Sequence, residues 1–232
     1  MPKEDTFVNK PKFIIILGIL IVAICTGGYF ILHCLPISLE HVMRKLDSYL
    51  TVNYSYISTN KSNIPNIEGI KTVTYHFKDT EGLEFCVVTF PRFGDYDTSQ
   101  PGYPKCNYLT EYYVAHKDLL ENALQCGVPI TWRNTGSTST FSLEIDSRAD
   151  LEHIAPALEV ALNMFDPLIS SDYSLTQIEK FEFSIPKISV CIGDEKRVFS
   201  VFDFRLAKNQ SSWTQQEILD KLYRDYNENN IN

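Results

Sequence analysis

The most apolar stretch of the chain lies close to its N-terminus. Residues 13–35 read FIIILGILIVAICTGGYFILHCL and contain no Lys, Arg, Asp or Glu. Since about 20 helical residues are enough to cross the hydrocarbon core of a bilayer, this stretch predicts a transmembrane helix after a tail of residues 1–12. A cleaved signal peptide is the alternative interpretation, because Ala23-Ile24-Cys25 loosely resembles a cleavage site. The apolar stretch continues well beyond that site, which favours an anchor that stays in the membrane.

The rest of the chain alternates between short strands and amphipathic helices. Apolar residues recur at helical spacing in four segments, residues 37–50, 108–125, 151–165 and 214–226. Apolar and polar residues alternate in three further regions, which predict hairpins within residues 73–87, 128–145 and 181–206. The polar, Asn-rich residues 51–70 match neither pattern, and Pro156 is expected to kink the third helix or to delay its start.

The order of these elements predicts the fold class. Three hairpin-then-helix units follow one another, at about residues 70–126, 128–165 and 180–226. Antiparallel hairpins do not build a parallel doubly wound sheet. We therefore expect one α+β domain over residues 36–232, in which helices pack on an antiparallel or mixed sheet.

Charged residues on the two sides of the apolar stretch predict its orientation. The tail carries three lysines, whereas the segment just after the stretch carries Arg44 and Lys45. An excess of positive charge marks the cytoplasmic side, and long domains translocate largely regardless of charge. We therefore expect a single-pass protein of the cell membrane, with a cytoplasmic N-terminus and residues 36–232 outside.

The net charge of the predicted domain limits its partners. Of 21 Lys and Arg and 29 Asp and Glu, three and two lie in the tail, which leaves 18 basic and 27 acidic residues. Phosphate backbones and anionic lipid surfaces attract basic proteins. This balance argues against nucleic acid and against an anionic bilayer surface as partners, so the expected membrane contact is the span over residues 13–35.

Local catalytic motifs are absent from the sequence. It contains no G-x-x-x-x-G-K, G-x-S-x-G, H-E-x-x-H or C-x-x-C, and no cofactor is expected. Asp95-Tyr-Asp97-Thr-Ser99 resembles the start of a calcium loop, but Gln100 stands where glycine is needed and Cys106 where a bidentate glutamate is needed. No metal site is therefore expected, and His116, on the apolar side of its helix, is interpreted as a boundary histidine with a satisfied hydrogen bond.

An anchored domain without catalytic motifs is better explained by recognition than by chemistry. We expect a membrane-anchored extracytoplasmic interaction or ligand-binding module, whose partner is an unknown protein or envelope ligand. Two alternatives stay open: a hydrolase of envelope material with a dispersed active site, and a structural subunit of a membrane complex.

The segment of residues 91–107, PRFGDYDTSQPGYPKCN, is the expected recognition segment. It is the longest connection between predicted elements, and such connections are usually functional or disordered. Aromatic rings supply contact area at low entropic cost, and charges orient a partner. The candidate binding residues are Arg92, Phe93, Asp95, Tyr96, Asp97 and Tyr103. The alternative is that the rings fold back and cap the sheet.

The predicted domain contains four cysteines, Cys86, Cys106, Cys126 and Cys191, in a compartment expected to be oxidising. If residues 108–125 form one helix, Cys106 and Cys126 lie about 30 Å apart and cannot be bridged. The favoured pairing is Cys86–Cys106 with Cys126–Cys191, and the other is Cys86–Cys126 with Cys106–Cys191. Four free, buried thiols are the alternative to both.

Overall fold

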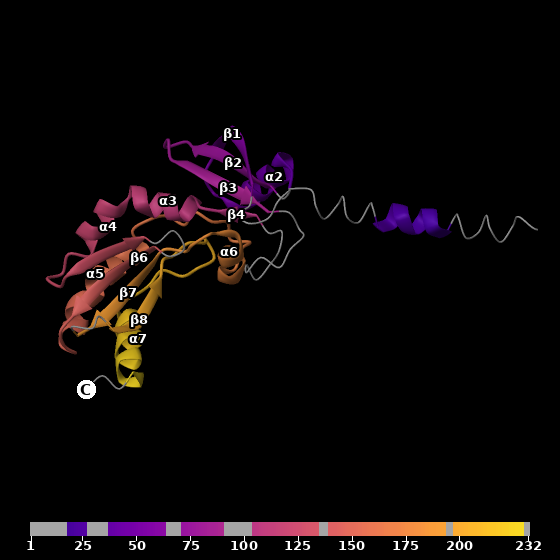
Figure 1. Ribbon diagram of the computed structural model, residues 1–232. Coiled ribbons are helices and arrows are strands. Elements are labelled where there is room, and N and C mark those ends of the chain that lie inside the picture. Colours follow the sequence, from indigo (N-terminus) through magenta and orange to yellow (C-terminus); the bar gives the residue numbers. More distant parts are fainter. Residues whose placement is uncertain are drawn as a thin grey trace, which may run out of the picture.

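The computed structural model of the chain describes residues 18–26, 37–63, 71–90, 104–134, 139–193 and 197–229 (Figure 1). Residues 18–26 are helical, and five of their aliphatic side chains, from Ile19 to Ile24, are between 52% and 65% exposed. Within the described ranges, no helix combines the length and the apolar character that crossing a membrane requires. Both ends of the predicted transmembrane helix over residues 13–35 lie outside those ranges, so this helix stays a prediction.

The first half of the domain is an antiparallel sheet with the order β1-β2-β3-β4. Its strands are β1 (Tyr54–Asn63), β2 (Lys71–Asp79), β3 (Glu84–Thr89) and β4 (Lys105–Cys106). Helix α2 (Leu39–Tyr49) buries Val42, Leu46 and Tyr49 in the core, and the Tyr49 ring lies against Phe181 of helix α6 (Leu175–Phe181). Tyrosines of β1 and β2 hold it beside this sheet, because the Tyr54 hydroxyl donates to the Met43 carbonyl at 3.0 Å and the Tyr75 hydroxyl donates to the Ile37 carbonyl, just before the helix, at 2.8 Å.

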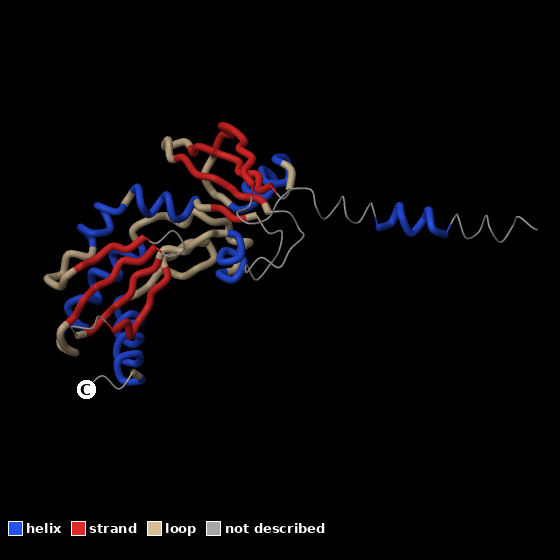
Figure 2. The backbone as a smooth tube through the Cα atoms, viewed as in Figure 1, coloured by secondary structure: helices blue, strands red, loops and turns tan. Residues whose placement is uncertain are grey.

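The second half is a mixed sheet with the order β5-β6-β7-β8, in which β6 and β7 run parallel. Its strands are β5 (Ile130–Asn134), β6 (Ser139–Ile145), β7 (Lys187–Ile192) and β8 (Arg197–Asp203). Figure 2 shows the strands as two separate groups. Helices α5 (Asp150–Asn163) and α7 (Gln215–Glu228) lie side by side on this sheet (Figure 1). Phe199 of β8 meets Tyr226 of α7 with ring centroids 5.7 Å apart.

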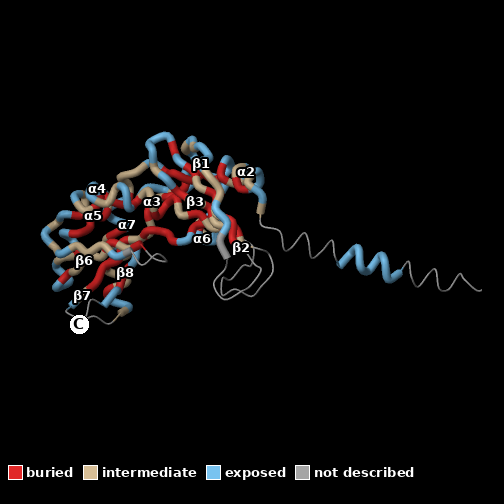
Figure 3. The backbone as a smooth tube through the Cα atoms, turned by 45° about the horizontal axis from the view of Figure 1, so that its top comes forward, coloured by how far each residue is buried: buried red, intermediate tan, exposed pale blue. Residues whose placement is uncertain are grey.

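One buried apolar cluster joins the two halves (Figure 3). Helices α3 (Tyr108–Ala115) and α6 (Leu175–Phe181) lie at the junction, and α4 (Lys117–Ala123) continues from α3 toward α5 (Figure 1). Tyr108 of α3 lies 4.8 Å from Phe85 of β3, and Tyr113 of the same helix lies 4.4 Å from Phe204, just after β8, both measured between ring centroids. Helix α3 therefore contacts both halves, and the two sheets share a single core.

The α+β class and the three hairpin-then-helix units are confirmed, but the expectation of one sheet is wrong. Residues 146–186 cross over between β6 and β7, and a crossover of a dozen or more residues permits parallel pairing. Residues 51–70 were expected to lie outside regular structure, yet residues 54–63 form β1. Its polar sequence fits an edge strand, which pairs with β2 alone.

The predicted helix boundaries also need correction. The helix expected over residues 108–125 is divided at His116 into α3 and α4, so Cys106 and Cys126 do not lie at the two ends of one continuous helix. The His116 ring nitrogen Nδ1 lies 2.8 Å from the Tyr112 carbonyl oxygen, beside the junction. Pro156 lies inside α5, which begins before it, so the delayed start is wrong. The third hairpin begins at Lys187 instead of Phe181, because α6 takes the preceding residues.

Candidate functional site

The expected recognition segment is described at its C-terminal end alone. Its candidate binding residues Arg92, Phe93, Asp95, Tyr96, Asp97 and Tyr103 lie outside the described residues and stay predictions. The end of the segment is not structureless as expected, because Lys105–Cys106 form β4 and pair with β3. Cys106 is fully buried there.

Strand β4 is held against the segment that follows α6. The Phe183 amide donates to the Cys106 carbonyl at 2.7 Å, and Cys106 forms a parallel bridge with Glu182. The Lys105 ammonium donates to the carbonyls of Glu179 and Glu182, each at 3.3 Å. The recognition segment therefore ends at a fixed position beside the C-terminal end of α6.

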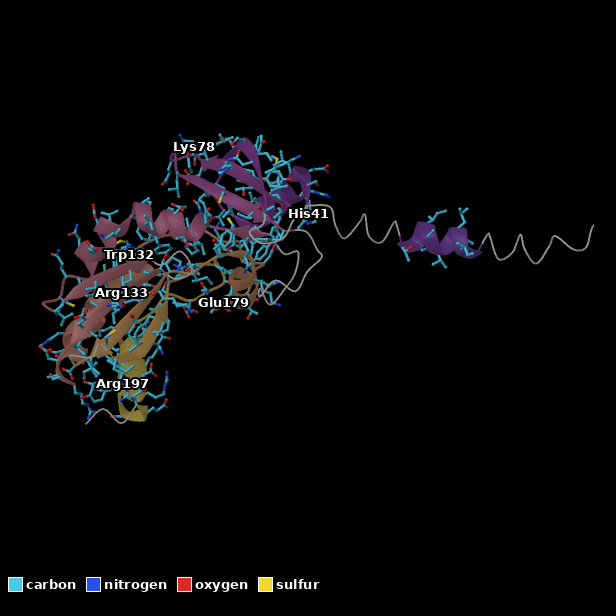
Figure 4. The ribbon with its side chains drawn as sticks, in the orientation of Figure 1. His41, Lys78, Trp132, Arg133, Glu179 and Arg197 are labelled. Carbon is cyan, nitrogen blue, oxygen red and sulfur yellow. The ribbon has the colours of Figure 1, made fainter. Side chains whose placement is uncertain are left out.

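An open cleft of about 280 Å³ lies next to this position. Residues of α6, of the segment between α6 and β7, and of β6 and β7 line it: Thr140, Glu179, Glu182, Phe183, Ser184, Ile185 and Lys187. Figure 4 shows Glu179 on α6. Phe183 is 39% exposed, so the lining of the cleft includes an accessible aromatic ring together with the charged residues Glu179 and Lys187.

The Glu182 carboxyl is turned away from the cleft into the core. Its residue is 1% exposed, the Tyr49 hydroxyl donates to Oε1 at 2.9 Å, and the Leu109 amide donates to Oε2 at 3.4 Å. Burial raises the pKa of Glu182 to about 8, against the opposing effect of these hydrogen bonds and of the nearby Lys105 charge. Burial likewise raises the pKa of Tyr49. With both oxygens engaged inside, this carboxyl links α2, α3 and β4 and does not face a ligand.

The five cysteines that the structure describes are free thiols. The favoured Cys86–Cys106 bridge is absent for a geometric reason. Cys106 is paired with Val87, and directly paired residues share a face of the sheet, so the preceding residue Cys86 points to the other face. Burial raises the pKa of Cys86 to about 11, which disfavours a nucleophilic thiolate. Cys126 and Cys191 are also unbridged.

His116 has a structural environment. Its ring lies 4.2 Å from that of Tyr112 and 5.2 Å from that of Phe165, between centroids, and its Nδ1 atom is beside a backbone carbonyl. This agrees with the interpretation of a satisfied boundary histidine. Across the described ranges, no three His, Cys, Asp or Glu side chains are placed to hold a metal ion, and Asp95 and Asp97 lie outside those ranges.

Comparison with protein-family models, with curated proteins and with solved structures found no match to this chain.

Sequence reasoning missed the cleft because its lining comes from segments that are far apart in the chain. The burial of Glu182 was also missed. It stands between Phe181 and Phe183, with the polar Lys180 and Ser184 on either side, and this alternation predicts an acidic side chain on the solvent face.

Proposed function

We propose that this protein is a membrane-anchored, extracytoplasmic binding module that takes its ligand in the cleft beside β4. The observation that carries the proposal is the position of this cleft at the fixed end of the recognition segment. Surface loops held by a rigid scaffold are common binding elements. The exposed aliphatic side chains of residues 18–26 support the anchor, because contiguous apolar surface is unfavourable in water.

The lining of the cleft favours a protein segment as the ligand. Phe183 presents an aromatic ring, and Lys187 and Glu179 present opposite charges. Aromatic anchors surrounded by polar groups are typical of protein recognition surfaces. The buried Glu182 carboxyl does not reach the ligand, so the geometry supports binding rather than proton transfer. An envelope hydrolase and a structural subunit stay alternative predictions.

Site-specific photo-crosslinking in native membranes tests the proposal. The full chain would carry p-benzoylphenylalanine in place of Phe183 or, as a control, in place of Val160, which is 55% exposed on α5. We expect a discrete protein adduct from position 183 that is absent from position 160. Adducts of the same composition from both positions, or from neither, would contradict binding in the cleft.

A charge reversal makes the test specific for the cleft. Lys187→Glu should reduce the adduct from position 183 by about tenfold. The new carboxylate would repel a negatively charged group of the ligand that the Lys187 ammonium attracts. The matched control is Lys117→Glu on α4. The Lys187–Asp203 and Lys117–Glu121 ion pairs have the same N–O distance of 3.3 Å and similar exposure. An equal loss of adduct in both variants would show a general charge effect and refute the assignment.

A further inference from the structure

Helix α2 carries a basic stripe on the face that is not packed in the core. His41, Arg44, Lys45 and Ser48 line a hollow of about 260 Å³. Their spacing of three, four and seven residues places them along one side of the helix. The neighbouring face of α2 is buried, so the helix cannot rotate to hide these side chains.

Aromatic neighbours hold part of this hollow in place. The Lys45 ammonium lies 4.5 Å from the ring centroid of Tyr173 and 5.4 Å from that of Phe181. The Ser48 and Tyr173 hydroxyls share a hydrogen bond of 2.7 Å. Arg44 approaches Glu40 at 4.0 Å, and both side chains are mostly exposed, so this pair is weak and a stronger anion can replace it. The hollow therefore presents two cationic groups and an imidazole.

The hollow also lies close, along the chain, to the proposed anchor. The predicted span ends at residue 35 and α2 begins at Leu39. An extended chain covers at most about 3.6 Å per residue, so His41 lies within about 20 Å of the end of the span. The headgroup layer of a bilayer begins where the hydrocarbon core ends. Chain length alone therefore keeps this basic stripe within reach of lipid phosphates.

We infer that the hollow on α2 binds the phosphate of an anionic lipid headgroup in the membrane that anchors the chain. The inference rests on the anchor in the proposed function. Guanidinium groups match phosphate oxygens in a fork of parallel hydrogen bonds, and an ammonium adds a point charge. The acidic net charge of the domain does not prevent this, because physiological salt screens charges beyond about 8 Å. Figure 4 shows His41 and Arg197 at opposite ends of the domain, so the charges at the far end contribute little.

Hydrogen–deuterium exchange of the full chain in lipid nanodiscs tests the inference. The bilayers are phosphatidylcholine alone, phosphatidylcholine with phosphatidylglycerol, and phosphatidylcholine alone with inorganic phosphate in the buffer. We expect slower exchange of residues 39–49 with phosphatidylglycerol. The double variant Arg44→Gln, Lys45→Gln should abolish the slowing, and Arg44→Gln alone should weaken lipid binding about fivefold, as expected for one charge near an anionic surface.

The control variant removes two charges at the far end of the domain, with Arg148→Gln and Arg197→Gln, and should keep the slowing. Slowing that persists in the Arg44, Lys45 variant, or that also disappears in the control, overturns the assignment to α2. Equal slowing by inorganic phosphate overturns the lipid as the source of the anion. A chain that does not enter nanodiscs contradicts the anchor itself, whereas a chain that enters without lipid-dependent slowing contradicts the headgroup site alone.

Discussion

The buried Glu182 carboxyl predicts that a neutral substitution stabilises the protein at neutral and alkaline pH. Glu182→Gln keeps the size of the side chain and imitates the protonated carboxyl. Its amide oxygen can accept from the Leu109 amide, and its NH₂ group can donate to the Tyr49 hydroxyl, in place of the present bonds of 3.4 Å and 2.9 Å. The variant therefore keeps the links to α2 and α3 and loses the capacity to ionise.

The size of the effect follows from the pKa of Glu182, which burial raises from 4.5 to about 8. Below about pH 4.5 the carboxyl is protonated in both the folded and the unfolded chain, and its contribution to stability is fully present. Between the two pKa values unfolding releases a proton, so the free energy of unfolding falls as the pH rises. At about 1.4 kcal/mol per pKa unit, the loss reaches about 3 kcal/mol at pH 7 and up to about 5 kcal/mol above pH 8. Glu182→Gln should remove this loss.

Urea unfolding of the full chain in nanodiscs, followed by tryptophan fluorescence, measures the difference. We expect the variant and the unmodified protein to be about equally stable near pH 4.5, and their difference to grow steadily to pH 8. The matched control is Glu179→Gln, which removes the same charge from the exposed side of α6 and should change stability by less than about 0.5 kcal/mol at every pH. A difference for Glu182→Gln that does not change with pH would refute the reasoning.

Three further predictions follow from the core, the thiols and the proposed topology. Leu158→Ala in α5 removes a fully buried side chain and should cost about 2–5 kcal/mol in urea unfolding, whereas Val160→Ala on the exposed side should cost less than about 0.5 kcal/mol. Alkylation and peptide mapping of the native protein should find Cys86 and Cys106 as separate thiols, and a joined peptide would contradict the strand pairing. Protease added to intact cells should degrade residues 36–232, and protection of the domain until lysis would reverse the proposed orientation.

Period-two alternation predicted local pairing reliably because it reports which face of a strand is buried. In the hairpin of β2 and β3, Phe77 pairs with Phe85 and the two rings stack with centroids 5.5 Å apart. The turn between these strands carries Gly82 at a φ of 95°, a backbone conformation that glycine adopts without strain. Sequence pattern and turn chemistry thus agree, and such agreement makes a hairpin predictable from one sequence.

Long-range pairing was not predictable in the same way. The parallel pairing of β6 with β7 joins strands on either side of residues 146–186. Nothing in the sequence of either strand indicates which strand it pairs with. Strand β1 illustrates a second limit, because it reads YSYISTNKSN and has a register shift between Tyr56 and Ser58. A shift of register moves side chains between faces, so the alternation that would reveal the strand is interrupted.

The basic stripe of α2 shows why net charge is a poor guide to local sites. Over the whole domain, 27 acidic residues outnumber 18 basic ones. This net count does not reveal that three basic side chains lie together on one side of α2. The spacing of His41, Arg44 and Lys45 was visible in the sequence, because residues three and four positions apart face the same side of a helix. The hollow was not predictable from the sequence, because it depends on how α2 packs against the rest of the domain.

Three consecutive residues at the C-terminal end of α6 face three different environments, so variants at these positions test different parts of the protein. Phe181 ends the helix in the core, with its ring centroid 4.7 Å from that of Tyr49 and 5.4 Å from the Lys45 ammonium of the basic stripe. Glu182 is buried beside α3, whereas Phe183 faces the cleft. A substitution that removes the Phe181 ring or the hydrogen bonds of Glu182 therefore changes the contacts with α2. Phe183 is partly exposed, so its replacement alters the cleft with the smallest change in folding stability and gives the clearest test of ligand binding.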